Sequence, residues 1–325
     1  MSNINNILGK LMQNIELGTL KEEPVRVTGG LLNRMYKVET DSGIYAVKHL
    51  NPEVMKRKDA KNNHIVAECI ANISKDNGLK CISAKIINNT PLQEFEGNYF
   101  LVFDWFEGKP ISEDCITKNH VKKVAELLAK IHSINYDSIK NKCTASGSIE
   151  EIDFDFYIAK LTNDDIKQLL ISNKETLQQL DQKSTEAAKE TRKHLVISHR
   201  DLDLPNILWD KYQNPVIIDW ESAGFVNPEE ELIETAWDWS GGQDYFDKDK
   251  FNLFIETYKE NGGSIDNLKK AIYANFKNKS GWLEYNLKRV CGIECIDEEE
   301  RQLGEKEVKR VINEILYFYK TMEIQ

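Results

Sequence analysis

Residues 199–206 read His-Arg-Asp-Leu-Asp-Leu-Pro-Asn, and residues 207–219 read Ile-Leu-Trp-Asp-Lys-Tyr-Gln-Asn-Pro-Val-Ile-Ile-Asp. Two apolar runs, 207–209 and 216–218, flank a polar turn, and this pattern predicts a β-hairpin. Asn206 precedes the first strand and Asp219 follows the second, so they should be neighbours, about 5 Å apart at Cα. Asp201 lies on the loop that leads to the same end. Three oxygen-bearing side chains are therefore expected to converge there.

The chemistry of these side chains favours a magnesium-dependent reaction. A carboxylate that follows a buried strand needs a partner, and a carboxylate with an amide oxygen suits Mg²⁺ that shares its shell with phosphates and water. The spacing His-x-Asp-x-x-x-x-Asn is typical of kinase catalytic loops. It predicts Asp201 as the base for an attacking hydroxyl, and Asn206 and Asp219 as metal ligands. An Asp- and Asn-rich loop that only closes a hairpin is the alternative.

An upstream lysine is the candidate for binding phosphate. Residues 44–50 read Ile-Tyr-Ala-Val-Lys-His-Leu, so Lys48 shares a strand face with apolar side chains and must reach either water or an anion. In kinases a lysine in this setting holds the α and β phosphates and pairs with a helix glutamate, here Glu68. Gly29 and Gly30 allow a tight turn with N–H groups that face phosphate, and a plain hairpin turn is the alternative.

Periodicity along the chain predicts an α+β fold with two lobes. A sheet lobe is expected at 1–103, a connection at 104–108 and a mainly helical lobe at 109–325. In the first lobe, one helix is expected at 62–76, and strands are expected within 24–50, at 83–87 and at 99–103. In the second lobe, Thr117 and Asn227 are expected to cap helices. Further helices are expected at 118–132, 164–181, 184–194, 249–260 and 305–320.

Composition narrows the class of protein. The chain has 325 residues and a net charge of −10, which argues against nucleic acid or an anionic membrane as the main partner. No signal-peptide-like or membrane-length apolar run is present, so a cytoplasmic location is expected. Six cysteines without a Cys-x-x-Cys pair indicate reduced thiols. The acidic excess lies after residue 106, where it would favour a cationic acceptor. Solvated helix faces are the alternative.

With these motifs in order, the sequence resembles the aminoglycoside phosphotransferase/choline kinase family over roughly residues 25–240. The family motifs read approximately His-Gly-Asp-Leu-x-x-x-Asn-Ile-Leu and Ile-Asp-Trp-Glu. This chain has His-Arg-Asp-Leu at 199–202, Asn-Ile-Leu at 206–208 and Ile-Asp-Trp-Glu at 218–221. Asp-Trp-Glu in place of Asp-Phe-Gly points away from protein kinases. Two positions depart from the family pattern: Arg200, where glycine is usual, and Asp203, where histidine is common.

The resemblance implies a bilobal protein-kinase-like fold and transfer of the γ-phosphoryl group of ATP, with Mg²⁺, to the hydroxyl of a small molecule. GTP is the alternative nucleotide. The resemblance also implies that residues 99–108 form the hinge between the lobes. Phe103 would back the adenine, and the backbone of Asp104 and Phe106 would pair with it.

The sequence does not single out one acceptor. Acids interleaved with aromatic residues could wall a pocket for an amine through charge and cation–π contact, and core tryptophans with solvated acids are the alternative. Aminoglycosides, choline-like amines, sugars, homoserine and macrolides all stay open as acceptors. A protein acceptor and a catalytically silent nucleotide-binding protein are the remaining hypotheses. The candidate acceptor-binding residues are Asp203, Glu221, Glu234, Asp238 and Trp239.

Overall fold

The computed structural model describes residues 2–27, 33–143, 149–293, 295 and 298–322. The chain forms two compact units, each built from two stretches of sequence. Unit 1 contains residues 1–144 and 197–225, and unit 2 contains residues 145–196 and 226–325. The catalytic loop predicted from the sequence therefore belongs to the same unit as the N-terminal sheet. The lobe boundary expected at 104–108 stays a prediction.

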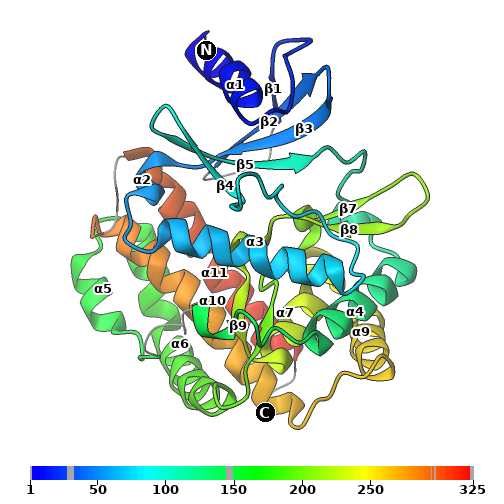
Figure 1. The fold of residues 1–325 in the computed structure, drawn as a ribbon. Helices are drawn as coiled ribbons and strands as arrows, with labels where there is room; N and C mark the ends of the chain where they lie inside the picture. The colour runs from blue at the N-terminus through cyan, green and yellow to red at the C-terminus, as the bar shows by residue number, and fades with distance from the viewer. Residues whose placement is uncertain (1, 28–32, 144–148, 294, 296–297, 323–325) are drawn as a thin grey trace. The chain divides into compact units, whose positions relative to one another are not determined.

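Unit 1 contains a five-stranded antiparallel sheet with the strand order β1-β2-β3-β5-β4 (Figure 1). The strands are β1 (Val25–Val27), β2 (Arg34–Thr40), β3 (Gly43–His49), β4 (Leu92–Phe95) and β5 (Asn98–Asp104). The sheet confirms the predicted N-terminal antiparallel lobe.

The prediction of a strand at 83–87 was wrong. The strand that precedes β5 in the sequence and pairs with it at the edge of the sheet is β4. Residues 83–86 form no regular element, and Ile87 makes only an isolated bridge with Thr90. Lys85 N donates to Val102 O (2.7 Å), but this bond is not part of a ladder. Asn88 and Asn89 both have positive φ, so the chain turns there, and β4 then makes the continuous pairing with β5. Asparagine tolerates this left-handed conformation better than most residues.

Helices cover the sheet through two separate apolar clusters. Helix α1 (Ser2–Asn14) lies beside the sheet (Figure 1). Its Leu8, Leu11 and Met12 belong to one apolar cluster with Val47 and Phe100. A second cluster joins Leu101 and Phe103 of β5 to the short helix α2 (Pro52–Met55) and to the start of α3 (Ala60–Asp76). The β-strand alternation of β5 thus sends neighbouring side chains into different clusters.

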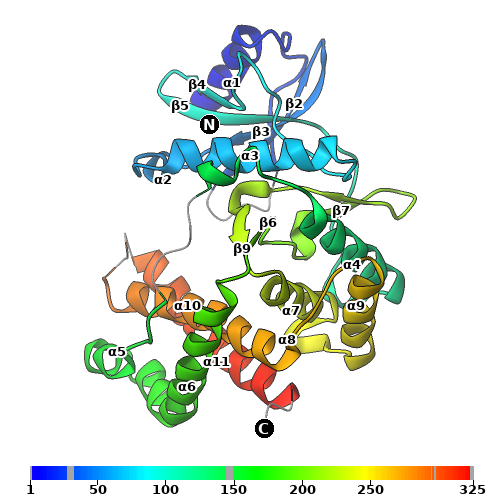
Figure 2. The same ribbon diagram turned by 60° about the horizontal axis from the view of Figure 1, so that its bottom comes forward.

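Two nested strand pairs carry the catalytic loop. The outer pair is β6 (Val196–Ser198) with β9 (Gly224–Val226), which the second view shows side by side (Figure 2). The inner pair is β7 (Ile207–Trp209) with β8 (Pro215–Ile217), in the register Ile207↔Ile217. Short 3₁₀ turns, η3 (Leu204–Asn206) and η4 (Trp220–Ser222), flank the inner pair. The hairpin predicted at 207–218 is therefore formed.

Other segments of unit 1 hold this hairpin from outside. On the β8 side, Ile217 N donates to Lys80 O (3.0 Å), and Ile217 O accepts from Ile82 N (2.9 Å). On the β7 side, Trp209 exchanges two hydrogen bonds with Lys109 (3.1 and 2.9 Å). Gly108 permits this approach, because a Cβ there would lie 3.1 Å from Trp209 O.

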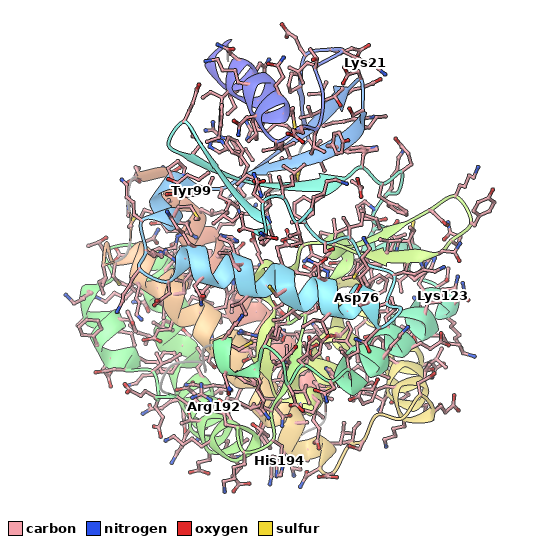
Figure 3. All side chains as sticks on the ribbon, in the orientation of Figure 1. Lys21, Asp76, Tyr99, Lys123, Arg192 and His194 are labelled. Carbon is pink, nitrogen blue, oxygen red and sulfur yellow. The ribbon has the colours of Figure 1, made fainter. Side chains whose placement is uncertain are left out.

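Helix α4 (Lys118–Ser133) fixes the turn of the hairpin. Lys123, labelled in Figure 3, donates from Nζ to Gln213 O (2.5 Å). His120 Nε2 bonds Gln213 Oε1 (2.9 Å). Thr117 caps α4 as predicted, because its hydroxyl accepts from the backbone N–H of His120. The helix predicted at 118–132 therefore braces the loop that connects β7 to β8.

Unit 2 is helical in its described residues, in agreement with the predicted helical C-terminal part. Helix α10 packs against α6, α7 and α11. Asn227 caps α7 by accepting from the N–H groups of Glu229 and Glu230, as the sequence predicted. The helices are α5 (Phe154–Lys160), α6 (Asp164–Thr191), α7 (Pro228–Trp239), α8 (Gly242–Tyr245), α9 (Lys248–Glu260), α10 (Leu268–Val290) and α11 (Glu298–Thr321).

The two helices expected at 164–181 and 184–194 are a single helix, α6. Asp181 is the last residue of the first expected helix, next to the expected break, and its side chain is buried. Its carboxylate accepts from Lys277 Nζ (2.8 Å) and from Ile152 N (2.7 Å). These partners satisfy a charged residue at a core position, so the helix continues.

None of the helices in the described part of the chain combines the length and the apolar character that a membrane-spanning segment requires.

Candidate active site

The inner hairpin brings the predicted catalytic side chains to one end. Ile218 N donates to Asn206 O (3.0 Å), which extends the β7–β8 pairing by one step, and Asp219 follows directly. Asn206 Nδ2 donates to both the backbone O (2.9 Å) and Oδ2 (3.1 Å) of Asp201. The convergence of Asp201, Asn206 and Asp219 that the sequence predicted is therefore present.

His199 positions this end of the hairpin from within the core. Its side chain is fully buried, and Nε2 donates to Ile218 O (3.0 Å). The imidazole ring also packs edge-on against Trp220, with ring centroids 4.7 Å apart. His199 thus ties the start of the catalytic loop to the residues on both sides of Asp219. Asp219 itself has φ of 61°, an uncommon conformation for a residue other than glycine that is frequent at functional sites.

Lys48 lies on β3 and is buried, with ion pairs to two carboxylates. Its Nζ donates to Asp219 Oδ1 (2.8 Å) and to Glu221 Oε2 (2.5 Å). Burial alone would lower the pKa of Lys48, but the charges of Asp219 and Glu221 outweigh it and raise the pKa. Lys48 is therefore a permanent cation that already contacts the proposed metal ligand. This contact connects the sheet to the catalytic hairpin.

The structure corrects the expected pairing of Lys48 with Glu68, because Lys48 pairs with Asp219 and Glu221. Glu68 lies on α3 with 3% of its surface exposed, and its carboxylate accepts from Ala84 N (2.6 Å). The charge of Lys48 nevertheless acts on the Glu68 carboxyl. Burial raises the pKa of Glu68 to about 7, although the bond from Ala84 and the charge of Lys48 act in the opposite direction. The Glu68 carboxyl is therefore about half protonated at pH 7, and it bonds Ala84 N in place of forming an ion pair with Lys48.

Glu221 was a candidate for acceptor binding, and the structure places it beside Lys48. Its Oε2 also accepts from Asn33 Nδ2 (2.9 Å), and Asn33 Oδ1 accepts from Asn51 N (2.9 Å). The carboxylate is thus fixed by a cation on one side and an amide on the other. Gly29 and Gly30, which the sequence suggested for phosphate binding, lie outside the described residues.

The predicted hinge residues lie at the end of β5. Phe103 pairs with Ala46 in the ladder and belongs to the second apolar cluster. Asp104 pairs with Tyr45, and its exposed carboxylate accepts from Lys85 Nζ (2.6 Å). Phe106 is half-buried. The contact of these residues with adenine stays a prediction.

His64 belongs to this site, and the sequence analysis missed it. It lies on α3 one turn before Glu68, on the same helix face, and is half-buried. Burial lowers its pKa, and the charges of Glu221, Lys48 and Asp219 all act on it. The ring therefore lies near the Lys48 ion pairs. The four-residue spacing from Glu68 was the signal that could have found it.

Asp203 adds a further carboxyl group to the catalytic loop. Its Oδ1 is buried and has no hydrogen-bond partner among the described residues. Burial, together with the charges of Asp201 and Asp219, raises the pKa of Asp203 to about 7, although the N–H of Asn206 acts in the opposite direction. These charges place Asp203 close to the catalytic residues.

The remaining acceptor candidates lie on α7 in unit 2. Trp239 is fully buried, so it fits the core alternative that the sequence left open. Glu234 and Asp238 are half-buried, and their charges act on Lys279, whose Nζ pairs with Glu314 Oε1 (2.5 Å). Burial raises the pKa of Glu234. Both acids interact with the ammonium group of Lys279. They are therefore not fully solvated, as the core-tryptophan alternative had assumed.

The donor atoms of the catalytic hairpin fit a magnesium ion that also binds phosphate. Among the described residues, no group of three or more His, Cys, Asp or Glu side chains is placed to hold a metal ion unaided. Because Asn206 Nδ2 bonds Asp201, its Oδ1 faces elsewhere, and Asp219 pairs with Lys48 through Oδ1 and keeps Oδ2. Two oxygen donors from the protein leave the other positions for phosphate and water, as Mg²⁺ sites usually do.

The buried carboxyl of Glu68 makes stability depend on pH. Its pKa is about 7 in the folded chain against an ordinary 4.5, so the folded state binds more protons between these values. The free energy of unfolding therefore falls as pH rises through this window, by on the order of 3 kcal/mol. Glu68→Gln should remove this loss, because glutamine still accepts from Ala84 N. We expect a higher Tm than wild type above about pH 7 and an equal Tm below pH 4.5.

The exposed Glu126 on α4 offers the matched control, and Glu126→Gln should follow the wild-type profile at every pH. Thermal unfolding followed by circular dichroism across this range measures the difference. A Glu68→Gln variant with the same pH profile as wild type would show that Glu68 is not the group responsible.

Comparison with known proteins agrees with this geometry. The chain resembles a spectinomycin phosphotransferase solved with ADP and spectinomycin, at 15% identity and a TM-score of 0.70, over 97% of this chain and 98% of that one. An ethanolamine kinase of Plasmodium vivax matches at 16% identity and a TM-score of 0.58, over 89% of this chain and 81% of that one. A macrolide 2′-phosphotransferase of Brachybacterium faecium matches at 12% identity and a TM-score of 0.59, over 94% of this chain and 97% of that one. At these identities the likeness shows the fold.

No curated protein matches the chain. The model of the phosphotransferase enzyme family matches residues 24–262, a range that begins before β1 and ends after α9. This range contains Lys48, the catalytic loop and Asp219. The match covers most of the chain, and with the bilobal kinase-like fold it settles the assignment: the chain belongs to the phosphotransferase enzyme family.

Proposed function

We propose that this chain transfers the γ-phosphoryl group of ATP to the hydroxyl of a small molecule, with Mg²⁺ as cofactor. One observation carries the proposal: Asp201, Asn206 and Asp219 meet at one end of β7–β8, and Lys48 contacts Asp219 there. A base, two oxygen ligands and a permanent cation are the groups that phosphoryl transfer requires. The similar spectinomycin phosphotransferase, solved with ADP and spectinomycin, supports a nucleotide and a small-molecule acceptor.

The geometry suggests a role for each side chain in the transfer. The acceptor hydroxyl oxygen forms a bond to the γ-phosphorus as its proton passes to Asp201. The bond from the γ-phosphorus to the β–γ bridging oxygen breaks, and ADP leaves with that electron pair. Asn206 donates to Asp201 Oδ2 and so fixes the orientation of the carboxylate that accepts the proton. Lys48 supplies positive charge to the phosphates, and Mg²⁺, when bound by Asn206 and Asp219, would supply more.

The charges of unit 2 favour an acceptor that carries an amine. Glu234, Asp238 and Glu314 all act on the ammonium group of Lys279, and Glu314 also pairs with Arg310 (2.8 Å). These carboxylates form an acidic cluster, whose negative potential would attract a cationic ligand. We therefore propose amine-bearing hydroxyl compounds as the first acceptor class, with neutral sugars as the second.

A coupled ADP-release assay over a panel of hydroxyl compounds tests the proposal. Each cationic compound is paired with its analogue that lacks the hydroxyl group. We expect ADP release with Mg²⁺ and a hydroxyl-bearing amine, and none with the matched analogue or with excess EDTA. A thermal shift with Mg²⁺ and nucleotide should accompany it. If neither assay responds to nucleotide, the proposal is contradicted and a catalytically silent protein is favoured. Release only with a protein acceptor would favour the protein-kinase alternative.

A further inference from the structure

Two carboxylates share the ammonium group of Lys48, and the transfer reaction as derived above gives a task to only one of them. Lys48 Nζ donates to Asp219 Oδ1 (2.8 Å) and to Glu221 Oε2 (2.5 Å). Asp219 is the proposed ligand of Mg²⁺, and a carboxylate that binds a divalent cation shares its negative charge with that cation. Glu221 is therefore the anion that stays with Lys48 when the metal site is in use.

The backbone around Asp219 directs both carboxylates to the same place. Asp219 has φ of 61°, and the 3₁₀ turn η4 starts directly after it. Trp220, the residue between the two acids, is 1% exposed, and its ring packs against the buried His199. The core thus anchors the turn through the tryptophan, and the side chains on either side of it both reach Lys48 Nζ.

Asn33 holds the Glu221 carboxylate from the side of the sheet. Its Nδ2 donates to Glu221 Oε2 (2.9 Å), the oxygen that also accepts from Lys48. Its Oδ1 accepts from Asn51 N (2.9 Å). Asn33 lies just before β2 and Asn51 shortly after β3, and these two strands pair along their whole length. The amide therefore ties the carboxylate to the strand pair that carries Lys48.

Glu68, the helix residue that the motif suggested for this task, is engaged elsewhere. Its carboxylate accepts from Ala84 N (2.6 Å), and burial raises its pKa to about 7. A carboxyl that is half protonated at pH 7 offsets the charge of a buried ammonium group less than an ionised one does. Glu221 contacts Lys48 directly, and 30% of its side chain is exposed. The contacts therefore favour Glu221 as the partner that holds the lysine.

We propose that Glu221 positions Lys48 for the phosphates of the nucleotide, and that Asn33 keeps Glu221 in place. An ammonium group has three N–H donors, so the bonds to Asp219 and Glu221 leave one for phosphate. The task that kinases give to a helix glutamate is carried here by the residue two positions after the proposed metal ligand. The inference rests on the proposed function, and it replaces the expectation that Glu221 binds the acceptor.

Acetylation of Lys48 tests this positioning without nucleotide or acceptor. An amine held by two carboxylates must leave both before it reacts with acetic anhydride, so its rate reports how firmly it is held. Rates are measured at one pH by peptide mass spectrometry, with the exposed Lys122 of α4 as internal reference. We expect Glu221→Gln to speed acetylation of Lys48 by roughly 10-fold, the difference between a hydrogen bond to a charged acceptor and one to a neutral acceptor.

Glu68→Gln is the matched variant, because it makes the same substitution in the residue that would hold Lys48 if the motif pairing applied. It keeps an acceptor for Ala84 N, and acetylation of Lys48 should stay close to the wild-type rate. A rise in Glu68→Gln as large as in Glu221→Gln would overturn the proposal. No rise in either variant would overturn it as well.

Asn33→Ala tests whether the amide acts through Glu221. The variant keeps both carboxylates and removes one hydrogen bond to Glu221, so it should speed acetylation of Lys48 by less than Glu221→Gln does. In the double variant the combined increase should fall short of the product of the two single increases, because the residues act in one network. Increases that multiply would show that Asn33 acts on Lys48 independently, and would overturn its part of the proposal.

Steady-state kinetics separates the positioning of Lys48 from binding of the acceptor and from loss of stability. We expect Glu221→Gln to raise KM for ATP and to lower kcat/KM for ATP by roughly 10-fold, with KM for the acceptor unchanged. A raised KM for the acceptor with an unchanged KM for ATP would assign Glu221 to the acceptor and overturn the proposal. A lower kcat with both KM values unchanged would indicate a smaller active fraction and would overturn it too.

The acetylation experiment also separates this inference from the proposed function. It requires no turnover, so the absence of phosphotransferase activity in the wild-type chain would leave the comparison of Glu221→Gln with Glu68→Gln decisive. Unchanged acetylation in an active enzyme would overturn the positioning role alone.

Discussion

Asp201→Asn is expected to lower kcat by about 100- to 10,000-fold, the contribution that general-base catalysis makes in enzymes. The variant keeps the size of the side chain and removes the group that accepts the hydroxyl proton. The loop should survive the change, because Asn206 Nδ2 also donates to the backbone O of residue 201 (2.9 Å), which the substitution does not touch. The expected loss is therefore in chemistry.

The measurement is steady-state turnover with the best acceptor from the panel, together with nucleotide affinity by calorimetry. Nucleotide affinity should change little, since the ion pairs of Lys48 are with Asp219 and Glu221, which this variant keeps. Asp137→Asn serves as the control, because it removes an exposed carboxylate of the same unit. A kcat near the wild-type value in Asp201→Asn would exclude Asp201 as the base.

Asp219→Asn should remove most of the benefit that Mg²⁺ gives to nucleotide binding and lower turnover by about 100- to 1,000-fold, as the loss of one electrostatic stabiliser typically does. The reason is that the substitution takes a negative charge from the proposed metal site, and Mg²⁺ prefers carboxylate oxygens. Lys48 keeps a partner in this variant, because Glu221 still accepts from its Nζ (2.5 Å). The buried ammonium group is therefore not left without an anion.

Calorimetric titration with ATP, in Mg²⁺ and in EDTA, measures this effect. Glu221→Gln is the matched control, because it removes the other carboxylate that pairs with Lys48. This control should keep the strengthening of nucleotide binding by Mg²⁺. Equal magnesium dependence in Asp219→Asn and wild type would show that Asp219 is not a ligand. Equal loss in both variants would show that the effect comes from Lys48.

The catalytic hairpin was predictable because its information is local. Two short apolar runs around a polar turn fix the pairing, and the pairing alone brings Asn206 to the level of Ile218. The caps of α4 and α7 were predictable for the same reason, since Thr117 and Asn227 bond backbone groups two or three residues away. Such contacts need no knowledge of the rest of the fold.

The elements that were wrong or missed depend on distant partners. Helix α6 was predicted as two helices with a break at residues 182–183, and the partner of the buried Asp181 beside that break, Lys277 of α10, lies 96 residues further along the chain. The sequence analysis predicted the wrong ion-pair partner for Lys48, because a motif cannot show that Asp219 and Glu221 lie nearer to it than Glu68. The helix α1 carries an apolar face, but its partners Val47 and Phe100 lie far along the chain.

The bonding of β7–β8 also has a consequence for synthesis on the ribosome. Residues 80–82, Lys109 and α4 leave the exit tunnel long before the hairpin that they bind. Until Asp219 and Glu221 emerge, Lys48 of β3 lacks its anions, and burial of a lone ammonium group is costly. The nascent sheet therefore gains full stability only when the hairpin docks. Unit 1 therefore reaches its full stability in the same step that brings the catalytic side chains together. A chain truncated before this hairpin would be poorly folded as well as inactive.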